Sequence, residues 1–280
     1  MKNFSLFVLS VIVAITPVFA GGGGQQSGGQ QSTGQTVAPY TIEVGGSTSV
    51  TPLIERMAAE YQKLKPHIKI NINGTGSGDG INNAGVLYQI GMSSRELTPA
   101  ELGRGLKAET IAIDGIAVIV NSSNPVANLS IEQIRDIYTG VITDWAQVTN
   151  GAKSGRIAVV SREEGSGTRG AFEELVGFQG RLVSGANEST STGAIISGIS
   201  TNSDAIGYIS LGSVNATVKT VSVGGTEPST ANVLNGSYKI ARPFILLSGN
   251  NISAESRTFL DWIMTTAGQD IAATSWIRVK

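Results

Sequence analysis

The sequence predicts an α/β protein in which short strands alternate with amphipathic helices. From Thr41 onward, apolar runs of strand length, such as TIEV (41–44) and IKINI (68–72), are separated by segments with apolar residues at helical spacing. With 280 residues, of which 40% are hydrophobic and 15% charged, the chain is long enough for one large or two medium domains with hydrophobic cores.

The expected strands are apolar runs bounded by glycine or polar residues. In chain order they are TIEV (41–44), IKINI (68–72), QIGMSS (89–94), ETIAIDGIAVIVN (109–121), RIAVV (156–160), AIGYIS (205–210), VKTVSV (218–223) and RPFILLS (242–248).

The first expected helix follows GGSTS (45–49), because Leu53, Ile54, Met57 and Tyr61 lie at helical spacing before Pro66 ends it. Further helices are expected after NGTGSGDG (73–80), near 130–138, over AFEELV (171–176), near 193–200 and over 254–266. This strand-loop-helix order is typical of an α/β sheet.

The N-terminus has the pattern of an exported protein. Residues 1–20 combine one lysine, an apolar run and a final small residue, which predicts a secretory signal peptide, with an uncleaved anchor as the alternative. Residues 21–38 are a Gly/Gln/Ser-rich tether. We therefore expect the chain to act outside the cytoplasm, in the periplasm or at the cell surface.

Composition excludes several classes of protein. The net charge of −1 provides no basic field for nucleic acid. The absence of cysteine excludes disulfides, thiol catalysis and thiolate metal sites, and the single histidine, His67, excludes a multi-histidine metal site. No cofactor or metal is expected.

Three loops share one design. GGSTS (45–49), GTGSGDG (74–80) and EEGSGTRG (163–170) each follow an expected strand, combine glycine with Ser or Thr, and precede an expected helix. Glycine allows close approach of the backbone to a ligand, and the N–H groups and dipole of a helix start favour an anion. With Arg162 beside the third loop, the three loops favour a shared anion site.

The third loop also fits other motifs. Residues 165–170 match G-x-G-x-x-G, but the next segment, 177–193, shows no convincing strand that ends in an acidic residue, although Glu188 lies near the required distance. No GK[ST] of a P-loop occurs, and Ser166 lacks the first glycine of G-x-S-x-G. We expect the adjacent pairs Glu163-Glu164 and Glu173-Glu174 to be mostly solvated.

From Thr41 to about Trp276 the chain resembles the phosphate-binding proteins of high-affinity phosphate ABC importers. The similarity lies in six segments that occur in the family's order: GSTSVTPLIERMAAEYQ (46–62), NGTGSGDGI (73–81), IGMSSREL (90–97), SREEGSGTRGAFEEL (161–175), AIGYISLG (205–212) and FLDWIMTTAGQ (259–269).

The resemblance implies the ligand contacts position by position. It implies a hydroxyl at Thr48, a backbone N–H at Ser49, a hydroxyl at Ser77, an arginine fork at Arg162 and the helix-start donors Ser166, Gly167 and Thr168; Ser47 and Gly78 are secondary candidates. Ser94 is also an implied ligand contact, at the position where many members carry a carboxylate to accept the phosphate proton. We expect Asp79 to substitute for it, Arg95 to balance Asp79, and Glu164 to hold Arg162.

The resemblance also implies a type II periplasmic-binding-protein fold, with two α/β lobes joined by crossing strands near 109–121 and 238–248. The lobe boundaries would be 39–115 with 241–280, and 116–240. The implied function is capture of inorganic phosphate in the interlobe cleft, without catalysis, by a monomer that delivers it to permease subunits. The alternatives are a protein that binds sulfate, molybdate or tungstate, an extracellular phosphatase, or a phosphate sensor.

Overall fold

The computed structural model describes residues 38–280, which form one compact unit. The predicted signal peptide and all but the last residue of the predicted tether lie outside the described residues. Within 38–280, no helix combines the length and the apolar character that crossing a membrane requires.

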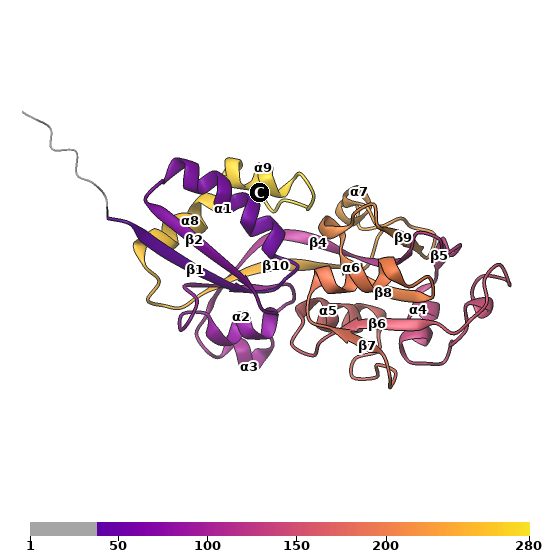
Figure 1. Ribbon diagram of the computed structural model, residues 1–280. Helices are drawn as coiled ribbons and strands as arrows, with labels where there is room; N and C mark the ends of the chain where they lie inside the picture. Colours follow the sequence, from indigo (N-terminus) through magenta and orange to yellow (C-terminus); the bar gives the residue numbers. More distant parts are fainter. Residues whose placement is uncertain (1–37) are drawn as a thin grey trace, which may run out of the picture. The chain divides into compact units, whose positions relative to one another are not determined.

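The strands of this unit form one mixed sheet in the order β2-β1-β3-β10-β4-β8-β6-β7, with β9 paired to β4 and β5 (Figure 1). Their bounds are β1 (Tyr40–Gly46), β2 (Ile68–Gly74), β3 (Ile90–Ser93), β4 (Lys107–Asn121), β5 (Asn128–Leu129), β6 (Ala158–Arg162), β7 (Asn187–Ser189), β8 (Ala205–Ser210), β9 (Val218–Val223) and β10 (Ala241–Ser248).

The helices connect and cover these strands. They are α1 (Thr51–Leu64), α2 (Ser77–Asn83), α3 (Pro99–Leu102), α4 (Ile131–Tyr138), α5 (Gly167–Val176), α6 (Thr192–Thr201), α7 (Thr230–Leu234), α8 (Ala254–Ile263) and α9 (Thr266–Ala272), with short 3-10 turns η1 (Trp145–Gln147) and η2 (Leu211–Ser213).

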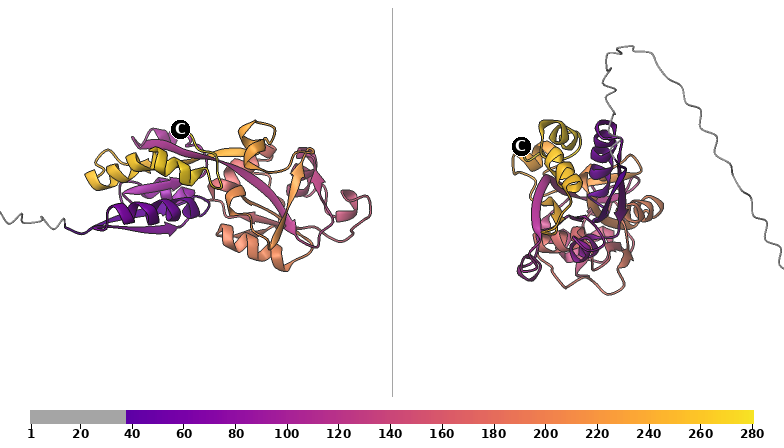
Figure 2. Two further views of the ribbon diagram at one scale, coloured as in Figure 1. Left: turned by 90° about the horizontal axis from the view of Figure 1, so that it is seen from above. Right: turned by 90° about the vertical axis from the view of Figure 1, so that its left-hand side faces the viewer.

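Two α/β lobes share the sheet, as the predicted fold requires. In what we call the first lobe, β1–β3 carry α1, α8 and α9 together over one face, with α2 and α3 on the other side (Figures 1 and 2). In the second lobe, β5–β9 carry α4, α5 and α7 around one core and α6 around a smaller one. Strands β4 and β10 pair with each other and run between the lobes.

From Ile111 to Val120 the long strand β4 is buried on both faces, apart from the half-buried Ile113, which explains the nearly continuous apolar sequence of this part. Ile116 and Val118 point into the larger core of the second lobe, and Ala117 and Ile119 point into the smaller core beneath α6. The first part of β4 pairs with β10 and the last part with β8 and β9. Strand β4 therefore forms backbone hydrogen bonds with strands of both lobes.

The structure differs from the sequence predictions at several elements. The short elements β5, α3 and α7 were not expected, and α2 begins at Ser77, within the second loop and not after it. The expected helix over 254–266 is two helices, because α8 ends before Met264 and Thr265 caps α9 by accepting a hydrogen bond from Gly268 N at 3.4 Å. The segment 177–193, which shows no convincing strand, contains β7, paired in parallel with the end of β6. Its three residues are all polar, so apolar alternation could not reveal it.

Gly46, at the end of β1, makes the first loop possible. Its φ of 133° suits glycine, and a Cβ there would lie 2.3 Å from the carbonyl oxygen of Met92 in β3. Because β1 and β3 are paired at this point, neither backbone can yield without loss of sheet hydrogen bonds.

We expect Gly46→Ala to lower the free energy of unfolding by more than about 3 kcal/mol, since it combines backbone strain with a steric clash. Gly151→Ala is the matched control: Gly151 also has a positive φ, 80°, but nothing lies within 4 Å of its Cβ position. The control should cost only about 1 kcal/mol. Urea denaturation measures both, and equal losses would contradict the packing argument.

Candidate anion-binding site

Three serine hydroxyls meet at the ends of the first lobe's parallel strands. Ser47 Oγ, after β1, donates to Ser94 Oγ, after β3, at 2.8 Å, and Ser77 Oγ, at the start of α2, lies 3.2 Å from Ser94 Oγ. All three residues are buried. Ser77 Oγ also accepts a hydrogen bond from Ser94 N at 3.1 Å, so loop and strand end are fixed to each other.

Hydroxyls of the first loop reach across to the second lobe. Ser49 Oγ lies 2.8 Å from Thr168 Oγ1, at the start of α5, and 3.3 Å from Thr192 Oγ1, at the start of α6. Thr48 Oγ1 lies 3.2 Å from Thr192 Oγ1 and accepts a hydrogen bond from Thr192 N at 3.3 Å. The starts of helices α5 and α6 therefore face the first loop.

The backbone approaches closely at the same place. Gly78 N donates to Gly165 O at 3.0 Å, from one lobe to the other. A Cβ on Gly167 would lie 2.3 Å from Ser77 Oγ and 2.8 Å from Ser94 Oγ. Only glycine at position 167 lets the third loop lie against the serine cluster.

The third loop and the segment 189–192, which precedes most of α6, present capped helix starts. Ser166 Oγ caps α5 by accepting from Arg169 N at 3.3 Å, and Ser191 Oγ caps α6 by accepting from Ala194 N at 3.1 Å. Each cap satisfies one N–H of the first turn and leaves others for a ligand. The positive end of both helix dipoles favours an anion at these starts.

Arg162 ends β6 with its side chain buried and paired to its neighbour. Nε and Nη2 each donate to Glu163 carboxylate oxygens at 2.7 Å, and Nη1 takes no part in this pair. The prediction that Glu164 holds Arg162 is wrong, because Glu163 does so and Glu164 is exposed. Glu163 and Glu173, the second of which pairs with Arg169, are thus engaged rather than solvated.

Asp79 lies on α2 but its carboxylate does not join the hydroxyl cluster. It accepts hydrogen bonds from Thr75 Oγ1 at 2.5 Å, Asn83 Nδ2 at 2.7 Å and the Tyr88 hydroxyl at 2.8 Å. These bonds, that of Thr75 foremost, lower the pKa of Asp79 despite partial burial. A carboxylate held ionised by three other donors does not fit the expected role of proton acceptor.

Arg95 also differs from the prediction. Its two terminal nitrogens donate to both carboxylate oxygens of Glu101 at 2.8 Å, so it does not balance Asp79. The hydrogen bonds from Arg95 are the main reason that the pKa of Glu101 falls to about 2. This pair holds α3 against the end of β3 and lies beside the site rather than in it.

The structure adds a buried cation that the sequence patterns do not indicate. Arg242, on β10, donates through Nη1 to Thr168 Oγ1 at 2.8 Å and to Ser94 O at 2.7 Å, and through Nη2 to Asp114 Oδ2, on β4, at 3.1 Å. Ser210 Oγ donates to the other oxygen of Asp114 at 2.9 Å. An ion pair between the two crossing strands therefore supports residues of the anion site.

Burial is the largest cause of the pKa shifts of Asp114 and Arg242. It raises the pKa of Asp114 to about 6, although Arg242 and Ser210 favour the carboxylate. Burial likewise lowers the pKa of Arg242, which Asp114 raises and the nearby positive charge of Arg162 lowers further. Two guanidinium groups thus lie within electrostatic reach of each other.

Eight of the predicted site residues lie together where the loops of the two lobes meet, and Ser166 and Arg162 are adjacent to them along the chain. The eight are Ser47, Thr48, Ser49, Ser77, Gly78, Ser94, Gly167 and Thr168. The sequence predictions do not include three residues of the site, Arg242, Asp114 and Thr192. The sequence could have indicated Thr192, because STSTG (189–193) precedes a helix as the three polar loops do. For Asp114 and Arg242 it offers only the presence of a charged residue in an apolar strand.

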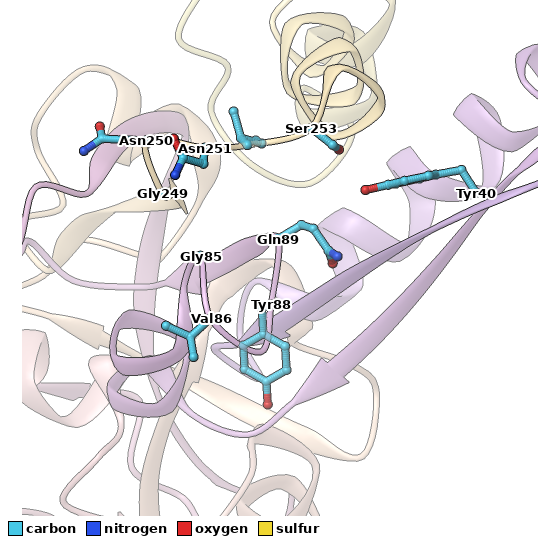
Figure 3. Close-up of a pocket in the computed structure, with 10 residues that line it drawn as sticks. Tyr40, Gly85, Val86, Tyr88, Gln89, Gly249, Asn250, Asn251 and Ser253 are labelled. Atoms are coloured by element: carbon cyan, nitrogen blue, oxygen red, sulfur yellow. The ribbon is translucent and has the colours of Figure 1, made fainter.

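The cavity in Figure 3 is a separate feature. It has a volume of about 330 Å³ and is lined by Tyr40 at the start of β1, by Gly85, Val86, Tyr88 and Gln89, and by residues 249–253. None of these lining residues belongs to the hydroxyl cluster. Across residues 38–280 no group of three or more His, Asp or Glu residues is placed to hold a metal ion.

Comparisons with known proteins define the class. A family model described as PBP superfamily domain matches residues 25–267, so the chain is a member of that superfamily. A putative phosphate ABC transporter substrate-binding protein from Clostridium perfringens, solved with bound phosphate, is 44% identical; the match covers 86% of this chain and 100% of that one, with a TM-score of 0.84.

Two further similar proteins also have names that concern phosphate transport or phosphate binding. An ABC-type phosphate transport receptor from Vibrio cholerae is 35% identical, with a TM-score of 0.68 and coverage of 84% of this chain and 99% of that one. Phosphate-binding protein PstS of Borreliella burgdorferi is 29% identical over 82% of this chain and 86% of its own length. Within the superfamily, the chain belongs to the phosphate-binding proteins of ABC phosphate transporters.

The raised pKa of Asp114 predicts a pH effect on stability. The folded state takes up this proton at about pH 6 and the unfolded state at about pH 4. Asp114 therefore destabilises the fold increasingly as the pH rises through this window, and adds no further change above it. Asp114→Asn removes the titrating group but keeps an acceptor for Arg242 and a partner for Ser210.

We expect the free energy of unfolding of the wild type, relative to that of Asp114→Asn, to fall by up to about 3 kcal/mol between about pH 4 and pH 6 and then to stay constant. Urea titrations at each pH measure this difference. A difference that rises or stays flat across the window would contradict a raised pKa.

Proposed function

We propose that the protein is an extracytoplasmic solute-binding protein that captures inorganic phosphate between its lobes and delivers it to an ABC-type importer. The observation that carries the proposal is the meeting of buried hydroxyls from both lobes, Ser49 and Thr168 above all, with the buried guanidinium of Arg162 at the head of the third loop and within electrostatic reach of Arg242. The Clostridium perfringens relative, which is solved with bound phosphate, supports this ligand.

The site fits the chemistry of a buried tetrahedral anion. Such an anion needs a donor for nearly every oxygen lone pair, because unpaired buried polar groups are costly. We assign hydroxyl donors to Thr48, Ser77 and Thr168, and backbone donors to Ser49 and Gly167. Arg162 Nη1, outside the pair with Glu163, supplies the charge-assisted contact, while Glu163 holds the fork in place.

Capture would close the two lobes on the ligand. The contacts Ser49 to Thr168 and Gly78 to Gly165 join loops that belong to different cores, so an anion bound there favours the closed arrangement. For the moving units we propose the boundaries 39–115 with 241–280, and 116–240. The closed monomer would present a surface of both lobes to permease subunits, and no catalytic step is assigned to it.

Location follows from this role. We propose that residues 1–20 direct export and that residues 21–38 tether the domain at the outer face of the membrane, so that phosphate is captured before transport. The match to phosphate-binding proteins PstS over most of the chain supports a role in phosphate uptake, which requires this location.

The serine at position 94 favours a second candidate, a binding protein for another tetrahedral oxyanion such as sulfate. Ser94 Oγ, in contact with Ser47 and Ser77, can either accept the proton of hydrogen phosphate or donate to a fully deprotonated oxyanion. A carboxylate at this position would reject sulfate by charge, and a hydroxyl does not. The ligand preference is therefore the discriminating measurement.

Isothermal titration calorimetry with phosphate, sulfate and molybdate tests both candidates. We expect phosphate to bind the wild type with a Kd in the micromolar range or below, and Arg162→Ala to weaken binding at least about 100-fold, because a charge-assisted contact to a buried anion is lost. Circular dichroism should show that the variant remains folded.

Arg257→Ala is the control, since Arg257 pairs with Glu109 and Asp261 outside the site. Its affinity should equal that of the wild type. If sulfate binds as tightly as phosphate, the second candidate function is favoured. If Arg162→Ala binds phosphate with unchanged affinity, the third loop is not part of the site.

A further inference from the structure

The guanidinium of Arg242 is buried directly behind the proposed site, and its contacts differ on its two sides. Nη1 faces Thr168 Oγ1 at 2.8 Å and Ser94 O at 2.7 Å, whereas Nη2 faces Asp114 at 3.1 Å. The carboxylate of Asp114 is held on its far side by Ser210. The positive end of this ion pair therefore points toward the anion site.

This arrangement determines which way the Thr168 hydroxyl can donate. A guanidinium only donates, so Thr168 Oγ1 must accept from Arg242 and its own hydrogen points elsewhere. Ser49 Oγ, 2.8 Å away, can use the remaining lone pair of Thr168. With both acceptor sites of Thr168 filled, its hydrogen is available to an anion in the site, and the chain of hydrogen bonds polarises it.

The same nitrogen connects the two lobes. Ser94 follows β3 in the first lobe, and Thr168 starts α5 in the second. Because Nη1 contacts both, Arg242 sets the position of Thr168 relative to the serine cluster. A lysine in its place would present one compact ammonium group and not a planar fork with separate nitrogens for Asp114 and for the site.

We propose that Arg242 is a positioning residue of the anion site, which orients the Thr168 hydroxyl as a donor to the bound anion. This inference rests on the proposed function. The competing explanation is that Arg242 only pairs with Asp114 to hold β10 against β4, in which case it supports the fold and does not act through Thr168.

A double-mutant cycle with Arg242→Lys and Thr168→Val separates the two explanations. Lysine keeps a positive charge beside Asp114, and valine has the shape of threonine without the hydroxyl. Calorimetry with inorganic phosphate gives the affinity of the wild type, each single variant and the double variant. Thermal melting without phosphate gives the corresponding effects on stability.

We expect each single variant to bind phosphate about tenfold or more weakly, the size of one charge-assisted hydrogen bond. The double variant should be no more than about threefold weaker than the weaker single variant, since both changes remove the same oriented donor. The inference would be overturned if the loss of phosphate affinity in the double variant equalled the product of the two single losses, or if Arg242→Lys bound phosphate with unchanged affinity. Either result would leave the proposed function intact.

Two further variants make the cycle decisive. If Arg242→Lys does not fold, Arg242→Gln combined with Asp114→Asn replaces it, because this pair leaves no uncompensated buried charge. Arg257→Lys, whose arginine also pairs with a carboxylate of β4, should leave affinity unchanged and show no coupling to Thr168→Val. A wild type that binds no phosphate overturns the proposed function, and this inference with it.

Discussion

The contact between the buried hydroxyls of Ser49 and Thr168, 2.8 Å apart, is the shortest of the side-chain contacts through which the first loop meets the second lobe. Buried hydroxyls need partners, so the loops that carry them must be placed accurately by the sheet beneath. The glycines serve this purpose: Gly46 turns the first loop over β3, and Gly167 lets the third loop touch Ser77. Backbone freedom and side-chain polarity are combined in the same short segments.

The crossing strands are more than a connection between the lobes. Strand β4 is buried on both faces in an apolar environment, yet it carries Asp114, and β10 carries Arg242 opposite it. Such a pair adds little net stability, because desolvation offsets most of its attraction. Its location, in contact with Thr168 and Ser94, gives it a role in the site that its energy alone does not explain.

The sequence predicts the alternation of strands and helices, and the three polar loops, because each depends on residues close in the chain. The resemblance to a known family supplied the two-lobed fold and the assignment of single residues to ligand contacts. The sequence could not predict ion-pair partners, because these depend on the rotamers of long side chains. Arg162 could pair with Glu163 or with Glu164, and Arg95 pairs with Glu101 and not with Asp79. The pairing of Asp114 with Arg242 depends on the register of β4 and β10, which the sequence does not reveal for two residues 128 positions apart.

Anomalous diffraction from crystals of the protein grown with arsenate, a phosphate analogue whose arsenic scatters anomalously, locates the bound anion directly. We expect one arsenic peak between the lobes, with the arsenate oxygens within hydrogen-bond distance of Ser77, Thr168 and Arg162 Nη1. A peak at another place, such as the cavity beside Tyr40 and Gln89, or contacts to one lobe only, would contradict this expectation.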